Sequence, residues 1–237
     1  MKISIFELLD GAKKARGTAV IIDVFRAFSL ECHLFAAGAA RVLAVGDAER
    51  AYELRRQMPE ALLFGERKGF PMPGADSGNS PAQLAGIPVA GRTVIHTTSA
   101  GTQGLAGASG ASEILAGSLV NAAAIAEYLR RSAPEEVSLV AMGVNAVERA
   151  DEDLLCARYI ESLLRGAPIP AERLDAETEA LKTGTGARFF HPEHQEAMPE
   201  EDFYLCTRRN QFPFVLRAEA GDGYFEMRRV GADGTGR

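Results

Sequence analysis

The chain has 237 residues, 46% of them hydrophobic, and a formal net charge of −6. It is long enough to bury one substantial core, and its negative charge argues against nucleic acid and acidic membrane surfaces as partners. Its three cysteines are widely spaced, and it has neither an apolar signal region nor an apolar run long enough to span a membrane. These features predict a reduced, cytoplasmic protein.

Apolar runs that suit strands alternate with helical stretches along most of the chain. Residues 2–6 are expected to form an edge strand or a lead-in to the fold, and the continuous apolar run 18–24 is typical of a strand buried on both faces of a parallel sheet. The other expected strands are 41–45, 61–64, 93–95, 113–115 and 137–142, and the expected helices are 28–37, 47–58, 103–109, 121–131, 151–164 and 171–182. This order predicts an α/β fold, with a three-layer α/β/α arrangement around a mixed, largely parallel sheet.

A short internal match indicates a duplication. Residues 38–44 (GAARVLA) align with residues 110–116 (GASEILA), and each lies in a strand–helix–strand–helix–strand series. The sequence therefore predicts two similar βαβαβ halves, residues 18–64 and 92–142, rather than a repeat array.

The C-terminal third shows weaker patterns. Residues 203–206 and 214–217 are expected to be short segments that close the fold. We expect one domain over residues 1–217, followed by a partly flexible extension, 218–237, whose last residues from 231 form a frayed tail.

A charged pair follows the first buried strand. Asp23 and Arg26 stand where open α/β sheets place ligand-binding residues. The alternative is that Asp23 caps the next helix and pairs with Arg26 at the surface. Because an aspartate in so apolar a run is costly to bury without a partner, we favour a site residue.

Hydroxyl-bearing residues and glycine follow the strand 93–95. They are Thr97, Thr98, Ser99, Gly101 and Thr102. A strand that turns into a helix through such residues can present N–H groups and hydroxyls to an anion. An ordinary turn with a Ser or Thr N-cap is an equally supported alternative, and no nucleotide-binding fingerprint identifies a ligand.

Residues 65–91 form a long loop rich in glycine and proline, and a loop of this length inside a compact domain is usually functional. Directly after the preceding strand it carries three charged residues, Glu66, Arg67 and Lys68. Further on, Asn79, Ser80 and Pro81 predict a helix start capped by Ser80, an arrangement that is also compatible with anion binding.

Three acids open the helix predicted over 151–164. Asp151, Glu152 and Asp153 suit the first turn because the helix dipole favours negative charge there. The functional alternative is that one of them turns inward as a metal ligand or general base. His191 and His194 are separated by a proline, which predicts a surface loop rather than a metal pair.

Five motifs occur in one order along the chain. They are IDVFRA (22–27), GER and GNSP within 65–81, HTTSAGT (96–102), GSLVNA (117–122) and EDLLCA (152–157). Over residues 18–216 this series resembles the 2-phosphosulfolactate phosphatase family, the magnesium-dependent phosphohydrolases of coenzyme M biosynthesis. The resemblance implies a three-layer α/β fold and hydrolysis of a phosphate ester on a small anionic hydroxy acid, with Mg²⁺ as cofactor.

The resemblance also suggests site residues. As catalytic residues we predict Asp23, Arg26, Glu66, Thr97, Thr98 and Asp153. As substrate- and phosphate-binding residues we predict Arg67, Asn79, Ser80, Ser99, Gly101, Thr102, Ser118 and Asn121, with Lys68 an alternative to Arg67 for a second anionic group. Magnesium, which prefers a few hard oxygen ligands plus water, is assigned to Asp23, Glu66 and Asp153.

Two departures from the family pattern affect the substrate. Phe28-Ser29-Leu30 replaces a Thr/Ser run, and Ala100 stands where asparagine is common. A phosphatase for another phosphorylated acid or a sugar phosphate, and a non-catalytic anion sensor, therefore stay as alternatives, although a pure anion binder has little use for so many acids. The attacking group is open between metal-activated water and a side chain. A homodimer is the default expectation for assembly.

Overall fold

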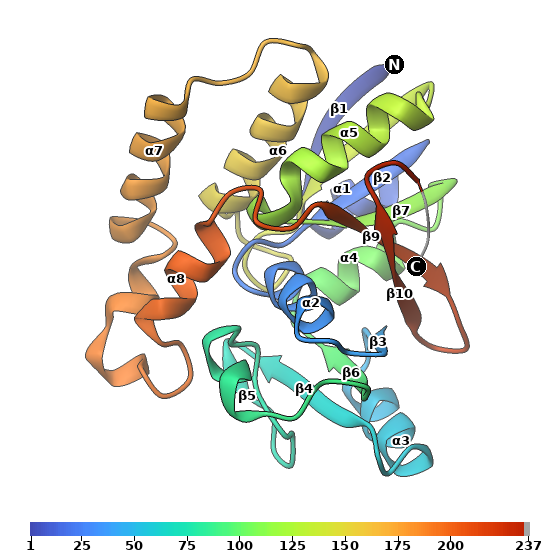
Figure 1. Cartoon of the computed structure of the whole chain (residues 1–237), viewed down its shortest axis with the longest axis vertical. Helices are drawn as coiled ribbons and strands as arrows, with labels where there is room; N and C mark the ends of the chain where they lie inside the picture. Colours follow the sequence, from blue (N-terminus) through green and yellow to red (C-terminus); the bar gives the residue numbers. More distant parts are fainter. Residues whose placement is uncertain (235–237) are drawn as a thin grey trace.

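The computed structural model describes residues 1–234. Within them, eight α-helices surround a mixed sheet of ten strands, which confirms the α/β class (Figure 1). The strands are β1 (Lys2–Glu7), β2 (Thr18–Ile22), β3 (Arg41–Ala44), β4 (Leu62–Arg67), β5 (Phe70–Pro71), β6 (Thr93–Thr97), β7 (Glu113–Gly117), β8 (Glu136–Ala141), β9 (Phe214–Ala220) and β10 (Phe225–Gly231). The helices are α1 (Leu8–Lys14), α2 (Ala27–Ala36), α3 (Ala48–Gln57), α4 (Gly101–Gly107), α5 (Ala122–Ser132), α6 (Asp151–Leu164), α7 (Ala171–Ala180) and α8 (Glu200–Thr207).

The sheet contains two groups of parallel strands joined by a hairpin. Its order is β1-β8-β2-β7-β9-β10-β3-β6-β4-β5. Strands β1, β8, β2 and β7 run parallel to one another, as do β3, β6 and β4. The β9–β10 hairpin pairs antiparallel with β7 on one side and β3 on the other. Figure 1 shows the first group above, the second below and the hairpin between them.

The two expected halves interleave in this sheet. Strand β2 lies between β7 and β8, and β6 lies between β3 and β4. The first strand of each half therefore pairs with the second and third strands of the other half. Read from opposite ends, the orders β8-β2-β7 and β4-β6-β3 correspond to each other.

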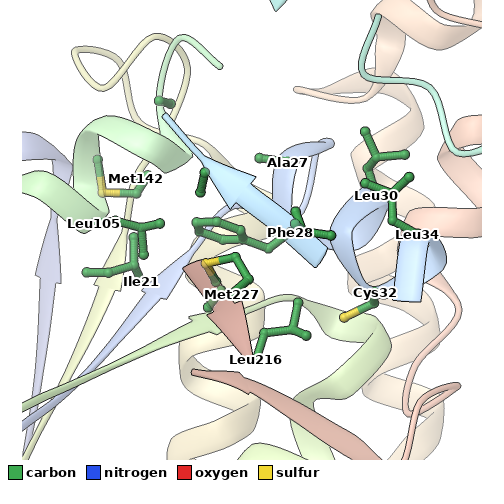
Figure 2. Close-up of a cluster of buried hydrophobic side chains, with 14 of the residues drawn as sticks. Ile21, Ala27, Phe28, Leu30, Cys32, Leu34, Leu105, Met142, Leu216 and Met227 are labelled. Atoms are coloured by element: carbon green, nitrogen blue, oxygen red, sulfur yellow. The ribbon is translucent and has the colours of Figure 1, made fainter. Parts of the chain in front are cut away.

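Strand β2 is buried on both faces, as its continuous apolar sequence predicts. Ala19 and Ile21 belong to one apolar cluster, which includes Leu105 of α4, while Val20 and Ile22 belong to a second, which includes side chains of α5 and α6. Figure 2 shows the first cluster, with the ring of Phe28 from α2 in contact range of side chains from several strands. This packing holds the end of β2, and thus Asp23, in a dry environment.

The residues from 218 onward were expected to form an extension, but the structure places them in the middle of the sheet. Met227 and Val230 of β10 are buried there, next to Val215 and Leu216 of β9. Gly223, with φ +76°, lies in the turn between the two strands, where a left-handed conformation favours glycine. Residues 232–234 follow β10, and the rest of the expected tail, 235–237, lies outside the described residues.

Other expectations hold with smaller adjustments. The helix expected at 151–164 is α6 with the same bounds, whereas the segment 203–206 is part of a full helix, α8. Helix α1 was not expected from the sequence, and β1 is an edge strand as predicted. Over residues 1–234, no helix is both long enough and apolar enough to cross a membrane.

Candidate active site

A pocket lies where the segments that follow β2, β6 and β8 meet the end of β4. It has about 580 Å³ of empty space, a figure that includes its open mouth. Its lining residues are Asp23, Phe25, Arg26, Glu66, Lys68, Gly69, Asn79, Ser99, Ala100, Gly143, Val144, Asn145, Glu152, Asp153, Arg188 and Met198. Polar residues spread over most of the chain thus face one hollow, as the sequence predicts.

Four buried carboxyl groups surround this pocket: Asp23, Glu66, Glu152 and Asp153. Burial raises the pKa of Asp23 to about 7, and the nearby carboxylates of Glu66 and Glu152 add to the rise. Burial also raises the pKa of Asp153 well above its usual value, with repulsion from Glu152 and Asp23 in the same direction. The pKa of Glu152 is raised by burial as well, although a hydrogen bond from Thr185 opposes it. The pocket therefore concentrates negative charge in a dry environment.

Asp153 joins two of the loops that form the pocket. Its Oδ1 accepts the N–H of Val24 and its Oδ2 accepts the N–H of Gly143, both at 2.8 Å. The acids of the first turn of α6 thus divide by direction, because Asp151 is exposed while Glu152 and Asp153 are buried. Glu152 and Asp153 therefore turn inward, as the functional alternative required.

Glu66 joins the loop after β4 to the loop after β6. Its Oε1 accepts the N–H of Ser99 at 2.7 Å, and its Oε2 accepts the N–H of Gly69 at 2.6 Å and the hydroxyl of Ser99 at 3.2 Å. Both oxygens are therefore engaged by the protein.

Asp23 differs from these two acids because one of its oxygens is free. Its Oδ1 accepts the N–H of Ala27 at 3.2 Å, but its Oδ2 accepts no hydrogen bond from residues 1–234. A Cβ atom at Gly101 would lie 2.9 Å from this Oδ2 and 2.9 Å from the Cβ of Ala27. Gly101, predicted to bind phosphate, instead allows the first turn of α4 to approach Asp23.

Arg26 is held by the protein rather than directed at an anion. Its side chain is 4% exposed, and it donates to Asp202 at 2.8 Å, to the carbonyl of Ala197 at 2.7 Å and to the carbonyl of Gly69 at 2.9 Å. Asp202 of α8 also accepts the hydroxyl of Ser80 at 2.8 Å. Arg26 and Ser80 therefore belong to a buried network with Asp202 of α8, and the phosphate contacts predicted for them stay a prediction.

Arg188 lines the pocket and was not predicted from the sequence as a site residue. Its Nη2 donates to the carbonyl of Phe25 at 3.1 Å, its Nε is buried without a partner, and it forms no ion pair within the described part of the chain. It belongs to a single turn of 3-10 helix, Ala187–Phe190, in a stretch without hydrophobic periodicity. Only the three-dimensional fold brings this cation to the acids.

Most of the remaining predicted hydroxyl residues are engaged by the protein. Thr98 and Thr102 exchange backbone-to-hydroxyl hydrogen bonds at 3.3 Å just before α4, whose N-cap, Ala100, has no capping side chain. The hydroxyl of Ser118 lies 2.6 Å from that of Ser29 in α2, and the hydroxyl of Thr97 accepts from Arg67 at 3.0 Å. Ser118 and Asn121 form a capping box at the turn Leu119–Asn121. The predicted residues that do not line the pocket are Arg67, Ser80, Thr97, Thr98, Gly101, Thr102, Ser118 and Asn121.

The contacts of the pocket acids bear on whether the site can hold a metal ion. In the described chain, no group of three His, Cys, Asp or Glu residues is arranged to hold a metal, so the triad predicted from Asp23, Glu66 and Asp153 is not preassembled. The charges nevertheless suit a divalent cation, because four acids face two cations, Arg188 and Lys68, that are not bound to an acid. Mg²⁺ commonly takes one or two carboxylates and completes its shell with water and phosphate, and the free Oδ2 of Asp23 meets that need.

The sequence was compared with known families and proteins. Residues 3–221 match the family model described as "2-phosphosulpholactate phosphatase". The chain belongs to this family. It is therefore an enzyme of the phosphoric monoester hydrolase class, as the ordered motifs predict.

Three relatives illustrate the similarity, and each is named "Probable 2-phosphosulfolactate phosphatase". The protein from Clostridium acetobutylicum is 31% identical over 235 residues, which cover 94% of this chain and 99% of the relative. The protein from Bacillus subtilis is 28% identical over 204 residues, 84% of this chain and 86% of the relative. The protein from Carboxydothermus hydrogenoformans is 38% identical over 165 residues, 69% and 68%.

Proposed function

We propose that this phosphatase hydrolyses the phosphate monoester of a small anionic hydroxy acid, with 2-phosphosulfolactate as the first candidate substrate and Mg²⁺ as cofactor. The observation that carries the proposal is the meeting of four buried carboxyl groups with the unpaired Arg188 in one pocket. The names of the relatives point to the same substrate.

The acids would hold the cofactor unequally. Asp23 would contact Mg²⁺ through its free Oδ2, while Glu66 and Asp153, whose oxygens already accept N–H groups, would contact the water ligands of the ion through their remaining lone pairs. When bound, Mg²⁺ neutralises charge on the phosphoryl oxygens and lowers the pKa of a bound water.

The basic residues and one amide would bind the anionic groups of the substrate. Arg188 has a guanidinium whose Nε is unpartnered, and such a fork can bind phosphate, sulfonate or carboxylate through two parallel hydrogen bonds. Lys68 and Asn79 also line the pocket. Arg188 and Lys68 would suit a substrate with two anionic groups, because each could bind one of them.

A panel of phosphate esters tests the substrate class. We expect released phosphate to be greatest for 2-phosphosulfolactate and other phosphorylated acids, and at least about tenfold lower in kcat/KM for esters without a second anionic group, because one cation then lacks a partner. Ala100 lines the pocket where the family pattern places asparagine, so phosphoglycolate, phospholactate and sugar phosphates belong in the panel.

The variant Arg188→Ala should remove this preference, lowering kcat/KM by about 100-fold for the dianionic acids and less for simple esters. Arg173→Ala, at an exposed arginine of α7 that pairs only with Glu177, is the matched control. An Arg188→Ala enzyme that keeps its full preference would show that Arg188 does not bind substrate.

The pKa of Asp23 leads to a prediction for stability. Its value of about 7 in the folded protein exceeds the ordinary 3.8, so the folded state binds this proton more tightly than the unfolded state does. The metal-free protein should therefore lose stability as pH rises from about 4 to about 7, with no further loss from this group above that range. Because Mg²⁺ requires the ionised acid, it should raise Tm more at pH 8 than at pH 5.

Thermal unfolding with and without Mg²⁺ at the two pH values measures this difference. In Asp23→Asn the pH-dependent part of the Mg²⁺ effect should shrink to what Glu152 and Asp153, whose pKa values are also raised, contribute, whereas the exposed Asp151→Asn should behave as wild type. Equal Mg²⁺ shifts at both pH values in the wild type would rule out binding by an acid with a raised pKa.

We also infer that the fold arose by duplication of a βαβαβ unit and that the enzyme acts in the cytoplasm. The matching strand orders β8-β2-β7 and β4-β6-β3 support the first inference. The second is supported by the free, buried state of Cys32, Cys156 and Cys206.

A further inference from the structure

Three residues form a hydrogen-bonded chain from the core to the pocket wall. Glu31 of α2 contacts Nδ1 of His96 on β6 through its Oε1 at 2.8 Å, and Nε2 of the same ring contacts Oδ1 of Asn79 at 2.6 Å. Glu31 and His96 are fully buried, and Asn79 is 3% exposed. Of the three, only Asn79 lines the pocket. A polar chain of this kind is costly to bury, so its arrangement calls for a reason beyond packing.

The contacts define which groups donate. In the arrangement that places Oδ1 of Asn79 at Nε2 of His96, the ring carries a hydrogen on Nε2, because an amide oxygen can only accept. Glu31 contacts the other ring nitrogen, Nδ1. Its other oxygen, Oε2, is buried without a partner, so the contact with His96 is its anchoring interaction.

A hydrogen on Nε2 of His96 holds the Asn79 amide with its oxygen toward the ring. The two ends of an amide have nearly the same shape, and hydrogen bonds decide which end faces which way. Because Oδ1 is bound to His96, the Nδ2 end is left for the pocket, and it has no partner within residues 1–234. The reversed amide would set Nδ2 hydrogens against the Nε2 hydrogen and would present an oxygen lone pair to the bound anion.

We propose that Glu31 and His96 are positioning residues that keep the N–H₂ group of Asn79 directed at an anionic oxygen of the substrate, most directly the phosphoryl group. The inference rests on the proposed phosphatase function. Asn79 touches the substrate, whereas His96 and Glu31 act through it. A preorganised donor of this kind stabilises charge that develops in the transition state without reorganisation at the moment of reaction.

A double-mutant cycle tests the coupling. His96→Phe keeps a ring of similar size and removes the donor, and we expect it to lower kcat of the Mg²⁺-loaded enzyme by about tenfold to 100-fold. Asn79→Ala should lower kcat by a similar factor, and the double variant should be no slower than Asn79→Ala alone. Additive losses would overturn the proposal, because they would mean that His96 acts independently of Asn79.

A second variant and a control separate positioning from folding. If His96→Phe folds poorly, Glu31→Gln keeps the side-chain volume, and its loss of kcat should likewise vanish in the Asn79→Ala background. His33→Phe, at a histidine of α2 that packs on Phe212 outside the pocket, should leave kcat within about twofold of wild type. A Glu31→Gln effect that persists without the Asn79 amide would contradict the proposal.

Long-range ¹H–¹⁵N spectra of the histidine rings provide a readout that does not depend on turnover. We expect His96 to show a hydrogen-bearing Nε2 in wild type and in Asn79→Asp, whose carboxylate can still accept it. A bare Nε2 would mean that the amide is reversed, and the proposal would fail. Should the wild type hydrolyse no ester of the panel, the proposed function fails, and this spectrum still decides the orientation of Asn79.

Discussion

Asp23→Asn is expected to abolish turnover while the metal-free protein remains at least as stable as wild type at pH 8. Asparagine keeps the shape of the side chain but removes the carboxylate whose Oδ2 is free to hold Mg²⁺. Loss of this metal contact should lower kcat by about 1,000-fold or more.

The stability part of this prediction follows from the buried charge. Burial raises the pKa of Asp23 to about 7, so at pH 8 the native protein holds an ionised acid in an unfavourable environment. A neutral amide avoids that cost. Phosphate release and urea unfolding, measured at pH 8 without and with Mg²⁺, test the two parts separately. Substantial residual turnover would remove Asp23 from the chemistry, and a lower unfolding free energy would make its loss of activity uninformative about catalysis.

Asp202→Ala is expected to lower the free energy of unfolding by about 3–5 kcal/mol, the largest stability effect that we predict for a single side chain. Asp202 is fully buried and pairs with the guanidinium of Arg26 at 2.8 Å. It also accepts the hydroxyl of Ser80 at 2.8 Å and the N–H of Ala82 at 3.0 Å. Truncation would leave a buried cation and two further donors without their acceptor.

Burial raises the pKa of Asp202 even though Arg26 opposes the rise, which shows how dry this position is. Urea denaturation at pH 7 measures the loss. The control is Glu161→Ala, at a partly exposed acid that pairs with Arg165 one helical turn away, where we expect a change within about 0.5 kcal/mol. Similar small changes for both variants would mean that water or a rearrangement replaces Asp202.

Much of the framework could be predicted from local patterns. The apolar run of β2, the helix α6 with its acidic first turn and the polar residues that follow strands all have strong local signals. Because β2 and β8 are neighbouring parallel strands, Asp23 and Asp153, which follow them, could be expected at the same edge of the sheet before any coordinates. Glu66 could not be placed with them in this way, since β4 belongs to the group of strands that runs in the opposite direction. The position of each oxygen could not be predicted either, since hydrogen bonds from distant backbone groups decide which of them is free.

The site residues that were missed lie where local signals are weak. Arg188 belongs to a stretch of short 3-10 turns, and its position near Asp23 depends on contacts with residues far away in sequence, such as its hydrogen bond to the carbonyl of Phe25. Conversely, hydroxyl-rich motifs look alike whether they bind an anion or cap a helix, and Ser118 and Thr98, which were predicted as site residues, do not line the pocket.

The C-terminal hairpin left a signal that could have been used. Residues 221–223 (Gly-Asp-Gly) form a turn sequence of the kind that joins antiparallel strands, and apolar residues lie on both sides of it. The abundance of charged residues in β10 pointed instead to an extension. Those charges are tolerated because Arg228 and Arg229 are exposed while Met227 and Val230 are buried.

The place of this hairpin has a consequence for how the chain acquires its structure. Residues 214–231 follow the other eight strands in the chain, and they connect β7 to β3. Until they emerge from the ribosome, both of these strands have an unpaired edge, the kind of surface on which chains associate with one another. A nascent chain therefore cannot close its sheet before residue 231 has emerged, and a premature stop just before Phe214 would leave the two groups of strands without the hairpin that hydrogen-bonds them into one sheet.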